Sequence, residues 1–260
     1  MKISIIIAFY KNLAGLELVL QGLQRQTYSN FEVIVAEDDN NAASLNFISE
    51  ARNKFPFQIK HISHEDKGFR KNLILNKAIQ ESKSEFLIFL DGDCIPHKHF
   101  VASYLRSARK DTALFGRRVL LSEELTQKLY EEKQLNHFSL WSIWNSTSED
   151  KRYALYLPFF KKQYKPGIFG CNWGIFKEKI LAVNGFDEDY ITAGVGEDND
   201  IEWRLAGTGL KIRSLRYSAI TYHLYHTLNY SEHDTRVGYD LLRKKKALNK
   251  TFCENGLKKS

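Results

Sequence analysis

The stretch Phe86-Leu87-Ile88-Phe89-Leu90-Asp91-Gly92-Asp93-Cys94 decides the fold of this chain. An apolar run of this length, bounded by a glycine, predicts a strand that is covered on both faces. Gly92 allows the backbone to turn sharply between the carboxylates of Asp91 and Asp93. Two such carboxylates repel each other unless a cation or a proton lies between them. The stretch therefore predicts either a Mg²⁺ or Mn²⁺ site or a plain turn with two solvated aspartates.

Strand-like and helical patterns alternate before this stretch. Apolar runs typical of strands occupy residues 3–9, 31–36 and 58–62. Helical spacing of apolar residues occupies 12–26, 42–54 and the segment that follows residue 70. Strands joined by crossovers of this length form a parallel sheet, and ligands of such sheets bind outside the carboxyl ends of the strands. We therefore expect an α/β fold with its binding site at that edge.

Polar residues follow each of the four strands expected in the first half. These ends are Tyr10-Lys11-Asn12, Glu37-Asp38, His64-Glu65-Asp66 and Asp91-Gly92-Asp93. In a parallel sheet they share one edge, so the sequence predicts an acidic and polar rim where chemistry takes place.

The second half has a less regular pattern. Short strands are expected at 112–116, 169–176, 211–213 and 219–222, and residues 122–165 are expected to form a helical insertion and a mobile loop. Glu197-Asp198-Asn199-Asp200 opens a predicted helix, where acidic residues favour the helix dipole. Capping alone does not explain three acids that follow the glycines Gly194 and Gly196.

Length and composition are those of a globular protein with one large α/β domain. The chain has 260 residues, of which 43% are hydrophobic and 27% charged. No apolar run reaches the ~18 residues that cross a bilayer. The apolar start resembles a signal peptide only weakly, because Tyr10-Lys11-Asn12 stands where a cleavage site belongs. The three cysteines, Cys94, Cys171 and Cys253, are widely spaced and fit reduced thiols, so we expect a cytosolic protein.

The net charge of +7 suggests an anionic partner, which is a nucleic acid, a nucleotide substrate or an acidic membrane surface. The excess lies late, in Arg243-Lys244-Lys245-Lys246, Lys250 and Lys258-Lys259. Residues 227–260 are expected to form a basic helical tail that either contacts the anionic inner face of the plasma membrane or is a solvated helix face. A nucleic-acid-binding module gathers basic and aromatic residues on one face, whereas the strand ends here are acidic. We therefore expect no nucleic-acid partner.

Taken together, the motifs resemble the family 2 glycosyltransferases of the GT-A fold over residues 3–226. In the first half the resemblance lies in Tyr10-Lys11-Asn12, Glu37-Asp38, His64 to Arg70, Asn76-Lys77-Ala78 and the D-x-D motif Asp91-Gly92-Asp93. In the second half it extends to chondroitin-polymerase-type and β-galactosyltransferase-type enzymes, through Asn172-Trp173-Gly174, Asn184-Gly185-Phe186-Asp187-Glu188, Gly196-Glu197-Asp198 and His223.

This resemblance implies a mixed, mostly parallel central sheet flanked by helices. A single domain would span residues 1–226, with a nucleotide-sugar-binding half at 1–95 and an acceptor-binding half at 96–226. Two departures are Ala8, where the family often has proline, and Gly194-Val195-Gly196, which lacks the tryptophan that often precedes Glu-Asp. Because that tryptophan usually lines the acceptor, the acceptor's identity stays open.

The resemblance also implies an activity. A hexose or N-acetylhexosamine would move with inversion from a UDP-sugar to a saccharide or lipid-linked saccharide, in the synthesis of a surface glycan such as capsule or lipopolysaccharide. Asp93 would hold Mn²⁺ or Mg²⁺, and Asp91 would contact the ribose or reach the metal through water. His223, in preference to His226, would be the third protein ligand.

Roles for the remaining site residues follow from the same resemblance. Asp198 would be the base that accepts the acceptor's proton, and Glu197 would orient the acceptor. Tyr10 would line the nucleotide site. Glu37 or Asp38 would accept a hydrogen bond from uracil. Lys67 and Arg70 would pair with phosphate, or they are solvated charges of the loop. Trp173 would either stack on a sugar or fill the core.

Two rival functions are less well supported. A nucleotidyltransferase acting on sugar phosphates needs a Gly- and Arg-rich phosphate loop after the first strand, and residues 10–15 are a poor candidate. A non-catalytic glycan-binding module has no need to retain Asp91, Asp93, Asp198 and His223 together.

Overall fold

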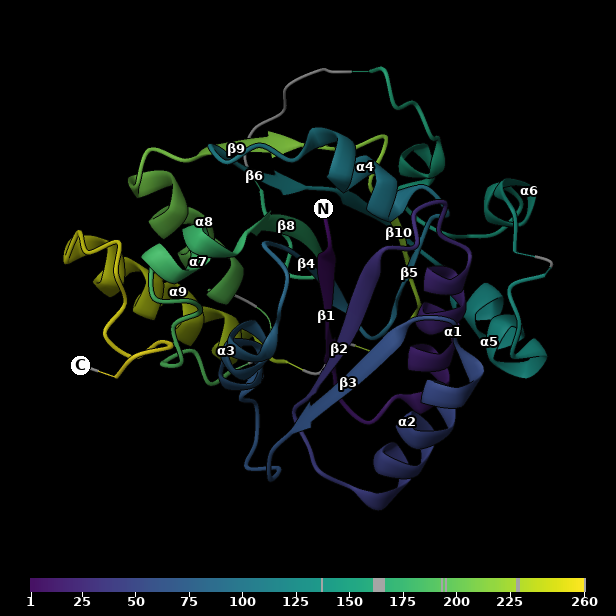
Figure 1. Cartoon of the computed structure of the whole chain (residues 1–260), viewed down its shortest axis with the longest axis horizontal. Helices are drawn as coiled ribbons and strands as arrows, with labels where there is room; N and C mark the ends of the chain where they lie inside the picture. Colours follow the sequence, from purple (N-terminus) through teal and green to yellow (C-terminus); the bar gives the residue numbers. More distant parts are fainter. Residues whose placement is uncertain (137, 161–166, 193, 195, 228–229, 260) are drawn as a thin grey trace.

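The structure is a computed structural model that describes residues 1–136, 138–160, 167–192, 194, 196–227 and 230–259. Its centre is a sheet of seven strands in the order β3-β2-β1-β4-β8-β6-β9 (Figure 1). The strands are β1 (Ile3–Phe9), β2 (Phe31–Glu37), β3 (Gln58–Ser63), β4 (Phe86–Asp91), β6 (Thr112–Phe115), β8 (Asn172–Phe176) and β9 (Lys211–Ser214).

Strands β3, β2, β1 and β4 pair in parallel, β8 runs antiparallel to both β4 and β6, and β9 is parallel to β6. The expected mixed, mostly parallel sheet is therefore confirmed. From β1 the chain builds β2 and β3 on one side, and β4 then pairs on the other side of β1. This reversal of strand order is where open α/β sheets bind their ligands.

Helices cover both faces of the sheet (Figure 1). They are α1 (Leu13–Gln24), α2 (Ala42–Lys54), α3 (Lys71–Glu81), α4 (Phe100–Ser107), α5 (Glu123–Glu132), α6 (Leu140–Trp144), α7 (Lys177–Ala182), α8 (Glu197–Gly207) and α9 (Glu232–Ala247), with a 3₁₀ turn η1 (Lys151–Ala154). Alternation along β1 sends Ile5 into the core shared with α1 and Ile6 into the core shared with α3. The three consecutive isoleucines of β1 thus supply both cores.

A second, three-stranded sheet joins the two halves of the chain. It consists of β5 (Cys94–Pro96), β10 (Ile220–His223) and β7 (Arg117–Leu120), with β10 in the middle. The sequence pattern did not predict β5, which has only three residues, or β7 (Arg117–Leu120), which begins with two arginines and has no apolar run. The antiparallel pairing of β5 and β10 places Cys94 opposite His223. This pairing brings the D-x-D turn to the late histidine.

The expected helical insertion forms α5, α6 and η1, while residues 137 and 161–165 of the expected 122–165 segment lie outside the described residues. The basic segment near the end forms α9 and folds back onto the domain. Lys245 in α9 lies 2.8 Å from Asp187, and Asn184 Nδ2 donates to the carbonyl oxygens of Cys253 and Lys258. Contact of this segment with a membrane stays a prediction. Within the described ranges, no helix combines the length and the apolar character that crossing a bilayer requires.

Candidate active site

A cavity of about 570 Å³ lies at the carboxyl ends of β1, β2 and β4. Residues from all three strand ends line it, including Tyr10, Asp38, Asp91 and Asp93. The second half of the chain contributes others, among them His226. The volume is in the range of cavities that bind small molecules and cofactors. Three of the four strand ends expected to form a polar rim therefore contribute to one cavity, whereas Glu37, His64, Glu65 and Asp66 are not among its lining residues.

Lys71 lines this cavity and contacts the carboxylate of Asp91. Its Nζ is 3.0 Å from Asp91 Oδ1, and both side chains are mostly buried. Burial by itself lowers the pKa of Lys71, but the charges of Asp91, Asp198 and Glu197 hold that pKa well above its usual range. Lys71 is thus a cation that offsets the repulsion between the carboxylates.

The sequence analysis did not predict that Lys71 belongs to the site, although its position at the start of a helix indicated an acidic partner. Lys71 is the first residue of α3, where the helix dipole disfavours a positive charge. A lysine at that position needs an acidic partner, and Asp91 is that partner.

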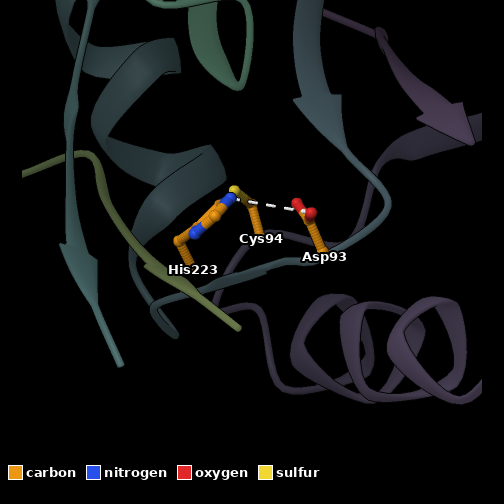
Figure 2. A group of neighbouring side chains, drawn as sticks. All are labelled: Asp93, Cys94 and His223. Carbon is orange, nitrogen blue, oxygen red and sulfur yellow. Dashed lines mark ion pairs between the residues drawn. The ribbon is translucent and has the colours of Figure 1, made fainter. Parts of the chain in front are cut away.

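The side chains of Asp93, Cys94 and His223 converge on one point (Figure 2). Their potential ligand atoms all lie within 4.8 Å of one another. His223 Nε2 is 3.6 Å and His226 Nε2 is 3.3 Å from Asp93 Oδ2. Asp93 Oδ1 is buried and accepts no hydrogen bond from the described residues. One carboxylate with an unused oxygen and two imidazoles fit a divalent metal ion.

The protonation states of Asp93 and His223 suit metal binding, whereas His226 must first lose a proton. Burial lowers the pKa of His223, which keeps its imidazole neutral at pH 7. The hydrogen bond with Asp93 raises the pKa of His226 to about 9. Burial opposes ionisation of Asp93, but the hydrogen bond with His226 and the nearby charge of His223 lower its pKa overall. His226 Nδ1 also lies 2.9 Å from the Thr227 carbonyl oxygen, a contact that orients the ring with Nε2 toward Asp93.

Asp198 lies in the first turn of α8, after the left-handed residue Gly196 (φ 119°). Its Oδ2 accepts a hydrogen bond of 2.7 Å from the backbone N–H of Gly170. A Cβ at position 170 would lie 2.6 Å from Asp198 Oδ1, so the contact requires glycine there. Burial and the neighbouring charge of Glu197 raise the pKa of Asp198 to about 7, and Lys71 opposes the increase. A carboxyl group with a pKa near neutrality is suited to general base catalysis.

The two acids at the end of β2, Glu37 and Asp38, point in different directions. Asp38 lines the cavity, where its Oδ1 is 2.6 Å from His64 Nε2 and its Oδ2 accepts a hydrogen bond from the backbone N–H of Arg70. Glu37 is fully buried, and its Oε2 is 2.7 Å from His61 Nε2. Asp38 is therefore better placed than Glu37 to bind the nucleobase of a donor.

Tyr10 is 51% exposed beside the cavity, and its hydroxyl donates to Asp66 over 3.1 Å. The side chains of Lys67 and Arg70 both turn to Glu65: Lys67 forms an exposed ion pair of 2.8 Å with its carboxylate, and Arg70 donates to its carbonyl oxygen. A phosphate-binding role for Lys67 and Arg70 stays a prediction.

Trp173 does not lie at the site. It is fully buried in β8, where its ring stacks on Phe89 at 4.5 Å and packs edge-on against Phe186 at 6.0 Å. The prediction that Trp173 stacks on a sugar is wrong, and its alternative, a core aromatic, is correct. Strand alternation directs this side chain into the core shared with α3.

Trp173→Ala is expected to lower the free energy of unfolding by about 3–5 kcal/mol, because it leaves a cavity in a closely packed core. Denaturant unfolding of the purified variant measures this. The donor affinity of the folded fraction is expected to match wild type. A variant with wild-type stability and weakened saccharide binding would contradict the core assignment.

Comparison with known proteins supports the same reading of the chain. The family model "Glycosyl transferase family 2" matches residues 4–181, and the model "N-terminal domain of galactosyltransferase" matches residues 152–227. The chondroitin synthase of Pasteurella multocida is 29% identical over 234 residues, which are 81% of this chain and 23% of that protein. The chain spans only about a quarter to a third of the length of the curated chondroitin synthases that it matches.

Solved structures share the fold at low sequence identity. The mannosyltransferase PcManGT from Pyrobaculum calidifontis, in complex with GDP-Man and Mn²⁺, has a TM-score of 0.64 at 16% identity, over 95% of this chain and 64% of that one. S. aureus TarS 1-349 in complex with UDP-GlcNAc has a TM-score of 0.60 at 18% identity, and the match covers 96% of this chain and 66% of that one. The mixed sheet is therefore the GT-A fold, and the chain belongs to glycosyl transferase family 2.

Proposed function

We propose that this chain transfers a hexose or N-acetylhexosamine, with inversion, from a UDP-sugar to a hydroxyl group of a saccharide. The observation that carries the proposal is that two carboxylates have different surroundings. Asp93 lies beside two imidazoles, and Asp198 is buried with a raised pKa. Lys71 lines the cavity beside Asp91, and the charge of Asp198 acts on it, so we place Asp198 close behind the cavity wall although it is not a lining residue. Family membership supports the same activity.

The nucleotide would occupy the cavity at the ends of β1, β2 and β4. Asp38 is the candidate acceptor for the uracil N–H, since His64 and the backbone of Arg70 hold its carboxylate at the cavity wall. Asp91, which Lys71 fixes in place, would accept a hydrogen bond from the ribose. Tyr10 is half-exposed beside the cavity and offers a flat apolar face to the base.

Asp93, His223 and His226 would hold Mn²⁺ or Mg²⁺. When bound, such an ion stabilises the negative charge of the leaving diphosphate. The unused Oδ1 of Asp93 and the neutral imidazole of His223 are the protein's contribution to that site. His226 would join the ligand set once it loses its proton, because its Nε2 lies 3.3 Å from Asp93 Oδ2; the sequence analysis favoured His223.

Asp198 would remove the proton from the acceptor hydroxyl as the hydroxyl oxygen attacks the anomeric carbon. The bond from that carbon to the diphosphate oxygen breaks, the bonding electrons leave with the nucleoside diphosphate, and the proton stays on Asp198. The Gly170 N–H fixes the Asp198 carboxylate during this step, and Glu197 lies beside it to orient the acceptor. Attack from the side opposite the leaving group inverts the configuration.

Transfer is expected to fall as the pH drops through about 7, because Asp198 must be deprotonated to act as a base and its pKa is about 7. A profile of kcat/KM against pH from about 4 to 9 measures this acid limb. A limb below about pH 5 would place a different, less perturbed group at the base position.

Lys71→Met is expected to move that acid limb upward by about one pH unit or more, because the cation that opposes protonation of Asp198 is removed. Activity lost at pH 7 should then recover in part at pH 9. Lys71→Arg keeps the charge and serves as the matched control. An unshifted limb in Lys71→Met would show that Lys71 does not act on the base.

A thermal-shift screen of nucleotides and nucleotide sugars tests the donor, since a ligand that binds the folded state raises Tm by mass action. UDP and at least one UDP-sugar, each with Mn²⁺, are expected to raise Tm more than the corresponding GDP and CDP compounds. The absence of any nucleotide effect would contradict the proposal. A place in surface glycan synthesis and a cytoplasmic location stay predictions.

A further inference from the structure

The buried thiol of Cys94 has no role in the proposed sugar transfer, although it lies beside two of the proposed metal ligands. Cys94 and His223 are directly opposite each other in the antiparallel pair of β5 and β10. Side chains of opposite residues in such a pair lie on the same face of the sheet. The sulfur and the imidazole therefore point to the same side, and Figure 2 shows both of them beside the carboxylate of Asp93.

The spacing of these three side chains fits a small tetrahedral ion. Zinc bonds nitrogen and oxygen at about 2.0–2.2 Å and sulfur at about 2.3 Å, so its ligand atoms lie roughly 3–4 Å from one another. His223 Nε2 and Asp93 Oδ2 are already 3.6 Å apart. The sulfur of Cys94 lies within 4.8 Å of a ligand atom of each. A side-chain shift of about 1 Å would therefore complete the set.

Access and charge also favour a cation at this point. Asp93 lines the cavity, so an ion can reach its carboxylate from solvent. Asp93 Oδ1 is buried and accepts no hydrogen bond from the described part of the chain. Two positive side chains oppose a cation, and both have partners: Lys71 Nζ is 3.0 Å from Asp91 Oδ1, and Arg118 donates to Cys171 Sγ at 3.7 Å. Asp93 Oδ1 is thus available to an ion.

We propose that Asp93, Cys94 and His223 bind Zn²⁺ in place of Mn²⁺, and that this binding inhibits sugar transfer. The inhibition rests on the proposed function, whereas the binding does not. A thiolate is a soft ligand that favours Zn²⁺, while Mn²⁺ and Mg²⁺ favour oxygen ligands. Three protein ligands leave the fourth position of a tetrahedral zinc ion open to water. The zinc ion would occupy Asp93 and His223, which the proposed transfer assigns to Mn²⁺.

Zinc binding at Cys94 releases a proton. Burial and a contact with Cys171 raise the pKa of the Cys94 thiol well above its usual range, so the thiol is protonated before the ion arrives. As the sulfur–zinc bond forms, the S–H bond breaks, its electron pair stays on sulfur and the proton passes to solvent. No group is oxidised or reduced in this step.

Cobalt spectroscopy of the protein without nucleotide tests the thiol as a ligand. Co²⁺ substitutes for Zn²⁺ in tetrahedral sites, and its bond to a thiolate gives an intense charge-transfer band in the near ultraviolet. The wild-type protein is expected to show this band, Zn²⁺ to abolish it, and Cys94→Ser to lack it. Cys253→Ser is the matched control and should keep the band, because Cys253 is also a buried free thiol but contacts the carbonyl oxygens of Val183 and Asn184.

Competition between the two metals measures the selectivity that Cys94 confers. Electron paramagnetic resonance reports the Mn²⁺ that Zn²⁺ displaces. Cys94→Ser is expected to lower the ratio of Zn²⁺ affinity to Mn²⁺ affinity by at least the roughly 10- to 100-fold that loss of an outer-shell partner costs. The Zn²⁺ concentration that halves UDP release with Mn²⁺ should rise accordingly. Thermal unfolding of each variant confirms that it is folded.

Three results would overturn the inference. The first is the absence of the charge-transfer band in the wild-type protein. The second is a band that persists in Cys94→Ser and disappears in Cys171→Ser, since Cys171 would then be the ligand. The third is an unchanged ratio of zinc to manganese affinity in Cys94→Ser. A protein that binds Zn²⁺ through Cys94 but releases no UDP from any UDP-sugar would instead contradict the proposed function alone.

Discussion

Asp198→Asn is expected to lower kcat for sugar transfer by roughly 10²- to 10⁴-fold, the range for loss of a general base. The amide keeps the size of the side chain and still accepts the hydrogen bond from the Gly170 N–H, but it cannot take the acceptor's proton. Affinity for UDP should change by less than about threefold, because Asp198 acts on the acceptor side. The large change in kcat with a small change in donor affinity is the signature of a base.

Initial-rate kinetics at pH 8, with UDP affinity measured by calorimetry, give both quantities. Glu178→Gln is a matched control, since it removes one exposed carboxylate from α7 on the same half of the chain. Near-normal sugar transfer by Asp198→Asn would show that another group is the general base. Glu197, the adjacent buried carboxylate, would then be the first to test.

Asp93→Ala is expected to reduce both Mn²⁺ affinity and kcat/KM by roughly 100-fold or more, because it removes the carboxylate about which both imidazoles gather. His223→Ala and His226→Ala should each weaken Mn²⁺ binding to a smaller degree. Electron paramagnetic resonance of Mn²⁺ measures the bound fraction without any dependence on turnover.

Asp111→Ala, which removes an exposed carboxylate paired with Lys211, is the control for the Asp93 variant. Wild-type Mn²⁺ affinity in Asp93→Ala would contradict the proposed metal site. If His226→Ala had no effect while His223→Ala did, the ligand set would be the one that the sequence favoured. Equal effects would support both imidazoles.

The long strands of the sheet could be predicted from the sequence because the pattern that marks each of them lies within a few consecutive residues. Buried parallel strands such as β1 and β4 need continuous apolar runs, and the polar strand ends at Tyr10 and Asp91 mark the edge where a ligand binds. The short strands β5 and β7 have no such signal, since their pairing with β10 depends on residues more than 100 positions away. The prediction that His223 lies near Asp93 therefore depended on the family resemblance alone.

Side-chain direction explains the remaining differences. Glu37 and Asp38 are adjacent acids, and only the three-dimensional sheet decides that Glu37 turns to His61 while Asp38 lines the cavity. The same alternation buries Trp173 against Phe89. The partnership of Lys71 with Asp91 joins a helix start to a strand end, so spacing alone could not reveal it.

Metal-dependent transfer at this site can be measured as release of UDP from a panel of UDP-sugars, with a saccharide acceptor mixture and either Mn²⁺ or EDTA. We expect at least one UDP-sugar to release UDP, EDTA to stop the release, and Asp93→Ala and Asp198→Asn both to lose it. Release that continues in EDTA, or formation of pyrophosphate in place of UDP, would contradict a metal-dependent glycosyl transfer at this site.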